Sequence, residues 1–146
     1  MITVKGLVKN FGSFQALKGL DMHVKAGEIY GFIGQNGSGK TTTMNILAGL
    51  SRPAQGKCIV NGIDVTKLTH PGDLNIGYLP EDPVFYPWMT AYETLVYLSG
   101  ARKTGCIGEI LHWTGLADAQ NRRVGGFSRG MKQRLGIGAA LIRNPQ

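Results

Sequence analysis

Apolar and polar positions in the first third of the chain predict strands followed by a short helix. Residues 2–8 alternate weakly and predict a strand, and residues 16–24 predict a second one. The largely apolar run 28–33 is typical of a buried strand, and residues 42–50 then predict a helix. That helix would place three apolar side chains on one face: Met44, Leu47 and Leu50.

The next third predicts a hairpin and one more strand. The dipeptide Asn61-Gly62 follows the apolar residues 58–60, and this dipeptide strongly indicates a two-residue hairpin turn. Residues 74–79 predict another strand, which ends at Pro80. The chain therefore begins as a β-rich region that is interrupted by one helix.

The last third predicts helices. Thr90 and Glu93 form a capping box before a helix over residues 91–101, and a second helix is expected over residues 107–114. Ser128 opens the last helix, which Asn144-Pro145 would end. Its apolar residues recur at helical spacing: Met131, Leu135, Ala139 and Ile142.

A glycine-rich loop of the G-x-x-x-x-G-K-[ST] type lies between the expected strand 28–33 and the expected helix 42–50. Strand, glycine loop and helix in this order form the setting in which the pattern indicates nucleotide binding. We therefore predict a triphosphate site made by these residues: Gly34, Gln35, Asn36, Gly37, Ser38, Gly39, Lys40, Thr41 and Thr42.

The residue types of this loop suit a triphosphate, which carries several negative charges on closely spaced oxygens. Gly34, Gly37 and Gly39 let the backbone curl so that successive N–H groups point inward. The positive end of the following helix adds to the attraction. Lys40 would bind the β- and γ-phosphates, and the Thr41 hydroxyl would ligate Mg²⁺.

Composition changes this interpretation little. The chain has 146 residues, of which 42% are hydrophobic and 17% charged, as expected of one globular domain without a membrane span or a secretory signal. Cys58 and Cys106 have no metal or redox spacing and are expected to be free thiols. The net charge of +7 suits a protein that holds nucleotide near an inner membrane face, and because the positive residues are scattered we expect no nucleic-acid partner.

Taken together, the motifs identify a family resemblance. The chain resembles the first part of an ABC transporter ATP-binding subunit, nearest to those that serve ABC-2 type exporters. The segment Lys9-Asn10-Phe11-Gly12 is similar to the family's A-loop, which implies that Phe11 stacks on adenine. The resemblance implies ATP and Mg²⁺ as the bound groups.

Two further segments carry the resemblance. Gly77-Tyr78-Leu79-Pro80-Glu81 is similar to the family's Q-loop, with Glu81 in place of glutamine, which implies a second candidate ligand for Mg²⁺ or water. Residues 127–134 resemble the signature segment, in which Ser128 and Gly130 match and Arg129 and Met131 depart from the usual residues. The resemblance implies that Ser128, Arg129, Gly130 and Met131 contact ATP held by a second subunit.

The implied fold is α/β, a P-loop NTPase with an ABC ATPase-type core, an antiparallel β subdomain and a helical subdomain, incomplete at the C-terminus. We expect residues 1–80 to form the β subdomain with the phosphate loop, residues 81–127 the Q-loop and helical subdomain, and residues 128–146 the signature helix. The family's Walker B strand would follow Gln146, so we expect this chain to bind ATP weakly, to hydrolyse it very slowly at best and to be marginally stable.

The family's implied role is that of a peripheral subunit on the cytoplasmic face of the cell membrane, which dimerises and drives transmembrane permease subunits. Two alternatives remain open at the level of sequence. One is a non-hydrolysing module that docks a partner when nucleotide is bound. The other is an ABC ATPase of DNA repair, which the short spacing between Glu81 and Ser128 disfavours because that class inserts a long coiled coil there.

Overall fold

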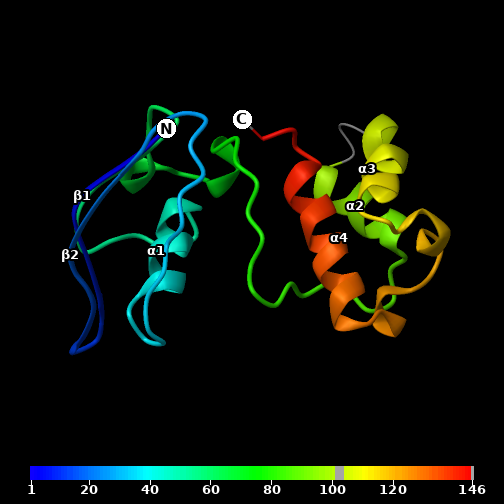
Figure 1. The fold of residues 1–146 in the computed structure, drawn as a ribbon, viewed down its shortest axis with the longest axis horizontal. Coiled ribbons are helices and arrows are strands. Elements are labelled where there is room, and N and C mark those ends of the chain that lie inside the picture. The colour runs from blue at the N-terminus through cyan, green and yellow to red at the C-terminus, as the bar shows by residue number, and fades with distance from the viewer. Residues whose placement is uncertain (101–103, 146) are drawn as a thin grey trace. The chain divides into compact units, whose positions relative to one another are not determined.

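The computed structural model describes residues 1–100 and 104–145, and its chain divides into two compact units. The first comprises residues Met1–Leu74 and the second residues Asn75–Gln146 (Figure 1). Across the described residues, no helix has both the length and the hydrophobicity that crossing a membrane requires. Each unit has its own buried side chains and is described separately.

The first unit contains a four-stranded antiparallel sheet with one helix against it. The strands are β1 (Ile2–Phe11), β2 (Phe14–Val24), β3 (Gln55–Val60) and β4 (Ile63–Asp64), in the order β2-β1-β3-β4. The helix α1 (Lys40–Leu47) contacts β2 and β3 (Figure 1). Two short 3₁₀ helices follow β4, at Val65–Lys67 and Pro71–Asp73.

A bulge explains why the alternation in the first strand is weak. Val4 pairs with Met22 and Leu7 with Leu20, so β1 carries one more residue than β2 between these pairs. The bulge turns both Val4 and Leu7 into the core, three residues apart, where a regular strand would bury every second residue. Gly6 within the bulge has a positive φ of 56°, which glycine adopts without strain.

The predicted hairpin at Asn61-Gly62 is confirmed. Both residues have positive φ, 49° and 82°, as a two-residue turn between twisted strands requires. Cys58 on β3 is wholly buried, and that burial, with a smaller contribution from the charge of Asp64, raises the pKa of its thiol to about 11. Neither Cys58 nor Cys106 is joined in a disulfide, as predicted, and burial holds Cys58 in its unreactive thiol form.

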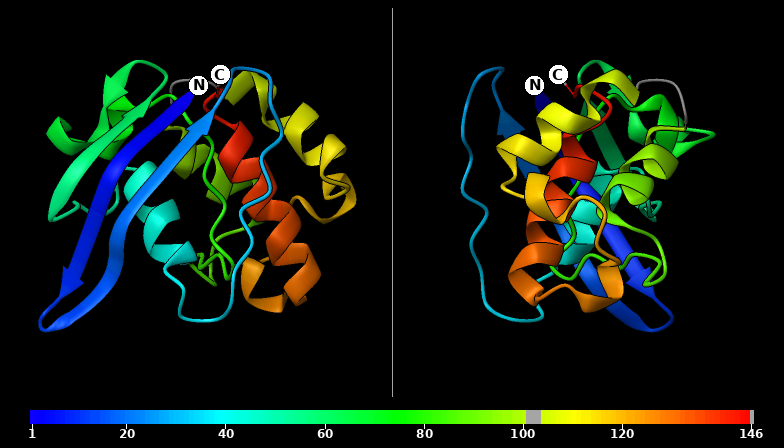
Figure 2. Two further views of the ribbon diagram at one scale, coloured as in Figure 1. Left: turned by 60° about the vertical axis from the view of Figure 1, so that its left-hand side comes forward. Right: turned by 90° about the vertical axis from the view of Figure 1, so that its right-hand side faces the viewer.

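Two predicted strands are wrong. Residues 28–33 run as an extended loop, with Ile29 and Ile33 almost fully exposed, and residues 74–79 are also irregular (Figure 2). A buried strand needs neighbours to satisfy its backbone hydrogen bonds. The strands of the described chain pair only with one another in the β2-β1-β3-β4 sheet, and none is paired with either segment.

The first helix also differs from its prediction. It begins at Lys40 rather than residue 42, and its buried residues are Thr43, Ile46 and Leu47, whereas Leu50 lies beyond the helix and is exposed. Thr43 tolerates burial because its hydroxyl donates a hydrogen bond to the Gly39 carbonyl over 2.9 Å. The buried face of α1 therefore shares only Leu47 with the face that the sequence predicted.

The second unit is helical. It contains α2 (Ala91–Ser99), α3 (Ile107–Trp113) and α4 (Arg129–Leu141), together with 3₁₀ helices at Thr104–Cys106, Ala117–Ala119 and Val124–Gly126 (Figure 1). All three α-helices contact one another. The final residue of the helix predicted over 91–101 lies outside the described residues, and Gly100 caps α2. The core joins side chains from each helix, including Leu95, Leu111 and Leu135, and the C-cap of α4, Ile142.

The capping box at the start of α2 is confirmed. The Thr90 hydroxyl accepts a hydrogen bond from the Glu93 N–H over 3.1 Å, and the Glu93 carboxylate accepts one from the Thr90 N–H over 2.8 Å. These hydrogen bonds from Thr90 lower the pKa of Glu93, because they stabilise its charged form.

This lowered pKa predicts an acid-sensitive contribution to stability. The contribution of Glu93 is present above its ordinary pKa and is lost as the pH falls through the lower pKa of the folded chain. We expect Glu93→Gln to reduce stability near pH 7 and the difference from wild type to vanish in acid. Urea unfolding of both chains across pH measures this, and a difference that stays constant in acid would contradict it.

Candidate functional site

The phosphate loop connects residues 28–33 to α1, and close contacts hold two of its glycines. A Cβ atom on Gly39 would lie 2.5 Å from Leu17 Cδ2 and 2.8 Å from the Ala16 carbonyl oxygen. Gly39 also has a φ of 89°, which side-chain-bearing residues rarely adopt. A Cβ on Gly34 would lie 2.6 Å from the Ser38 hydroxyl. Position 39 therefore requires glycine for the loop to keep this path, whereas a side chain at position 34 would need only the Ser38 hydroxyl to turn aside.

Lys40 spans the loop from the first turn of α1. Its Nζ donates hydrogen bonds to the Gly34 carbonyl over 2.6 Å and to the Gln35 carbonyl over 2.7 Å. The ammonium group is thus held against the loop's own backbone. A phosphate group placed there would offer the same nitrogen charged acceptors, and charge-assisted hydrogen bonds are stronger than bonds to neutral carbonyls.

The start of α1 supplies backbone donors. Its N-cap, Gly39, has no side chain to cap the helix, and the Thr43 N–H is the first in this turn that bonds within it, to the Gly39 carbonyl over 2.8 Å. In the loop, the Ser38 N–H bonds to the Gln35 carbonyl over 3.2 Å. An uncapped helix start that follows a left-handed glycine is suited to an anion.

The two threonines after Lys40 differ in exposure. Thr41 is exposed and Thr42 half-buried, so the Thr41 hydroxyl is accessible to a metal ion carried by a triphosphate. In the part of the chain that the structure describes, no three His, Cys, Asp or Glu side chains gather into a metal site. The exposed Thr41 hydroxyl fits a metal ion that arrives with the phosphates.

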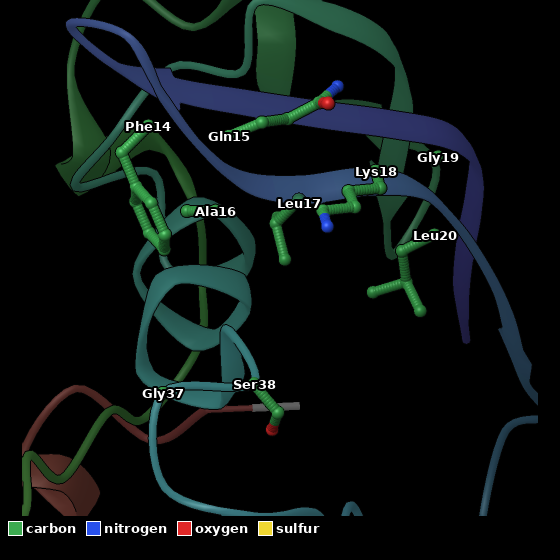
Figure 3. Close-up of a pocket in the computed structure, with 9 residues that line it drawn as sticks. All are labelled: Phe14, Gln15, Ala16, Leu17, Lys18, Gly19, Leu20, Gly37 and Ser38. Carbon is green, nitrogen blue, oxygen red and sulfur yellow. The ribbon is translucent and has the colours of Figure 1, made fainter.

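A cavity of about 540 Å³ borders the phosphate loop in the first unit. It is lined by β2 from Phe14 to Leu20 and by Gly37 and Ser38 (Figure 3). Phe11, the predicted stacking residue, lies at the end of β1, half exposed, with Lys9 Nζ 5.2 Å from its ring centroid. Its register partner Phe14 lines the cavity.

The signature-like segment begins α4 in the second unit. Ser128 is the N-cap of this helix, and its hydroxyl accepts a hydrogen bond from the Met131 N–H over 3.3 Å. Ser128, Arg129 and Gly130 are exposed, and Met131 packs partly against the helical core. The first turn of α4 therefore presents its N-terminus to solvent.

Arg129 forms an ion pair with Asp82 over 3.2 Å, although both side chains are about three-quarters exposed. An exposed pair of this kind contributes little to stability. The Glu81 side chain is exposed, and the Gln133 side-chain amide donates a hydrogen bond to the Glu81 carbonyl. The Glu81 backbone is thus tied to α4 while its carboxylate remains in solvent.

The glycine at position 136 explains how the segment around Glu81 lies so close to α4. A Cβ on Gly136 would lie 2.5 Å from Leu79 Cδ1 and 3.2 Å from Pro83 Cγ. The Gly136 position on α4 thus leaves room for the chain on both sides of Glu81. The sequence analysis did not single out Gly136, because its role depends on neighbours far away in sequence.

Sequence reasoning also missed the lining of the cavity. It singled out the phosphate loop and Phe11, but not the β2 residues Phe14, Ala16 and Leu17, all of which line the cavity. Ala16 and Leu17 also lie close to Gly39. The available signal was the short turn with an aromatic residue at each end, Phe11 and Phe14.

Comparison with known proteins agrees with this geometry. The family model described as ABC transporter matches residues 17–146. An uncharacterized ABC transporter ATP-binding protein of Bacillus subtilis, YxlF, is 42% identical over all of this chain and 50% of its own length. The bacitracin transport ATP-binding protein BcrA of Bacillus licheniformis is 40% identical over all of this chain and 49% of its own length. The chain spans about half the length of these curated relatives.

Solved structures show the same fold. A dimeric bacterial ABC transporter cassette matches 99% of this chain and 71% of its own, with a TM-score of 0.89 and 27% identity. A dimeric ATP-binding cassette in a post-hydrolysis state with ADP and Pi matches the same shares of the two chains, with a TM-score of 0.86 and 27% identity. The matched region contains both the phosphate loop and the segment that begins α4.

Proposed function

The chain belongs to the ABC transporter family, and on that premise we propose that it forms the ATP-binding part of a transporter subunit. Its fold is the α/β ABC ATPase cassette, as its motifs predicted. We propose that residues 34–42 bind the phosphates of ATP, with Thr41 as a ligand of the accompanying Mg²⁺. The whole protein would couple ATP binding and hydrolysis to the movement of a substrate across a membrane.

The phosphate loop is the observation that carries this proposal. Gly39 holds a position that a side chain would block, and the Lys40 ammonium group lies across the loop, where it donates hydrogen bonds to two backbone carbonyls. The uncapped start of α1 adds backbone donors at the same place. A cradle with these features fits a polyanion, and Mg²⁺ would partly neutralise its charge there.

A second copy of the subunit completes the proposed site. The first turn of α4 is exposed, and its backbone N–H groups point out of the helix start. We therefore expect the γ-phosphate of ATP held by the opposite subunit to contact Ser128, Arg129, Gly130 and Met131. The similar cassette of known structure is a dimer, which supports this arrangement. Glu81 remains a proposed ligand of Mg²⁺ or of the attacking water.

The transport role follows from the relatives. Several are named as transporter ATP-binding proteins, which supports this role over one in DNA repair. We propose transmembrane permease subunits as partners and the cytoplasmic face of the cell membrane as the location. One relative is named for bacitracin transport, but substrate choice would depend on the partners rather than on the residues described above.

Ser128 provides the experiment that tests this proposal. Aspartate caps a helix about as well as serine, so Ser128→Asp should leave α4 folded while it places a negative charge where a phosphate would bind. We expect self-association induced by Mg²⁺ and a non-hydrolysable ATP analogue, measured by analytical ultracentrifugation, to fall by about tenfold or more in Ser128→Asp.

Ser128→Asn is the matched control, since asparagine caps the helix without adding charge. It should retain most of the analogue-induced association. If wild type binds the analogue but never self-associates, the dimer model is wrong. If Ser128→Asp associates as well as wild type, the assignment of this helix start to the phosphate is wrong.

A further inference from the structure

Residues 77–83 lie along one face of α4 within the second unit. A Cβ on Gly77 would lie 2.7 Å from the Ala140 carbonyl oxygen, so this end of the segment lies against the last turn of the helix. At the other end, the Gln133 side-chain amide donates its hydrogen bond to the Glu81 carbonyl. The α4 residues that meet the segment are spaced by three or four positions and share a face: Arg129, Gln133, Gly136 and Ala140.

This packing places the Asp82 carboxylate at the start of α4. Asp82 Oδ1 lies 3.2 Å from Arg129 Nη2, and both side chains line a pocket of about 270 Å³ together with Pro83, Lys132 and Gln133. The pocket therefore has two cationic side chains and one anionic side chain in its lining. Both members of the ion pair are about three-quarters exposed, so an anion from solvent can reach the Arg129 guanidinium.

Arg129 has two candidate partners of the same charge. One is the Asp82 carboxylate of its own chain, and the other is the γ-phosphate that is proposed to bind at the start of α4. A guanidinium binds carboxylate and phosphate groups through the same N–H donors. The carboxylate occupies one of these donors and neutralises the charge that would attract a phosphate, and a phosphate beside Asp82 would be repelled.

We propose that Asp82 competes with the γ-phosphate for Arg129 and thereby limits the ATP-dependent association of two subunits. This inference rests on the proposed function of the α4 start, and it adds a residue that restrains association rather than supports it. Because the ion pair is exposed, it is weak enough for a phosphate to displace the carboxylate. Removing the charge of Asp82 should therefore strengthen the association, although it breaks an ion pair.

The test measures self-association of the full chain by analytical ultracentrifugation with Mg²⁺ and a non-hydrolysable ATP analogue. The analogue is kept saturating for every variant, which isothermal titration calorimetry checks. We expect Asp82→Asn to strengthen association about fivefold, because an exposed pair contributes up to a few-fold at each of the two equivalent sites of the dimer. Asp118→Asn is the matched control, since it removes the same charge from an exposed position outside α4 and should associate as wild type does.

Arg129→Gln provides a second comparison, because glutamine keeps a similar helix propensity and removes the charge. This variant should associate more weakly than wild type. In its background, Asp82→Asn should no longer strengthen association, because the group for which Asp82 competes is absent.

The outcomes separate this inference from the proposed function. If wild type binds the analogue and stays monomeric, the dimer model is wrong and the role of Asp82 falls with it. If wild type associates and Asp82→Asn gains less than about twofold, only the role of Asp82 is overturned. An equal gain in Asp118→Asn, or an equal gain from Asp82→Asn in the Arg129→Gln background, would overturn it as well. Because Asp82 and Arg129 are exposed, their replacement should leave the fold intact, which thermal melting checks.

Discussion

Replacing Lys40 with alanine is expected to weaken the binding of Mg²⁺-ATP by about 10- to 100-fold. The ammonium group is the full positive charge within the loop, and it lies within hydrogen-bond distance of the Gly34 and Gln35 carbonyls. Hydrogen bonds to a charged group contribute about 1.5–3 kcal/mol, which corresponds to a loss of this size. Isothermal titration calorimetry with ATP, at fixed ionic strength, measures the loss directly.

Tripolyphosphate, which has the phosphates without a base, gives this experiment a second readout. In the proposed site Lys40 binds the phosphates rather than the base, so Lys40→Ala should weaken the binding of tripolyphosphate and of ATP by similar factors. Lys25→Ala is the matched control, because it removes the same charge from an exposed position outside the loop. If both lysine variants weaken ATP equally, the effect is one of net charge, and the assigned role of Lys40 is wrong.

The features that sequence predicted well are those whose partners lie within a few residues. Thr90 and Glu93 satisfy each other's backbone groups across a single turn, and Asn61-Gly62 closes a hairpin by its own positive φ angles. Ser128 likewise caps α4 through the Met131 N–H. Each of these depends on local chemistry, so the residue types alone were sufficient.

The predictions that were wrong concern features whose partners lie far away in the sequence. Residues 28–33 have the composition of a buried strand, but a strand also needs neighbouring strands, and composition does not supply them. The buried face of α1 was misjudged for a related reason. Thr43 is buried because its hydroxyl reaches the Gly39 carbonyl, which a scale based on side-chain hydrophobicity cannot anticipate.

The candidate site also has one part that is set by neighbouring residues and another that is set by residues distant in sequence. The glycine-rich loop is recognisable in the sequence because its motif consists of consecutive residues, and the structure places Gly39 in a left-handed conformation with no room for a side chain. The cavity lining was not predicted, because the bulge at Ala16 decides which residues of β2 face the loop.

The largest effect on stability is expected from Leu135→Ala on α4. Leu135 is wholly buried among side chains of α2 and α3, so its truncation both loses apolar burial and leaves a cavity. Such changes cost about 2–5 kcal/mol in other cores. Urea unfolding, followed by the signal of the helices, should show this loss as a lower midpoint.

Leu141→Ala supplies a control within the same helix. Leu141 is 41% exposed, and the substitution changes the intrinsic helix propensity by the same amount. It should therefore cost less than about 1 kcal/mol. The difference between the two variants isolates the packing of Leu135 from the formation of α4 itself. Equal losses in both variants would mean that the core of α2, α3 and α4 is not tightly packed around Leu135.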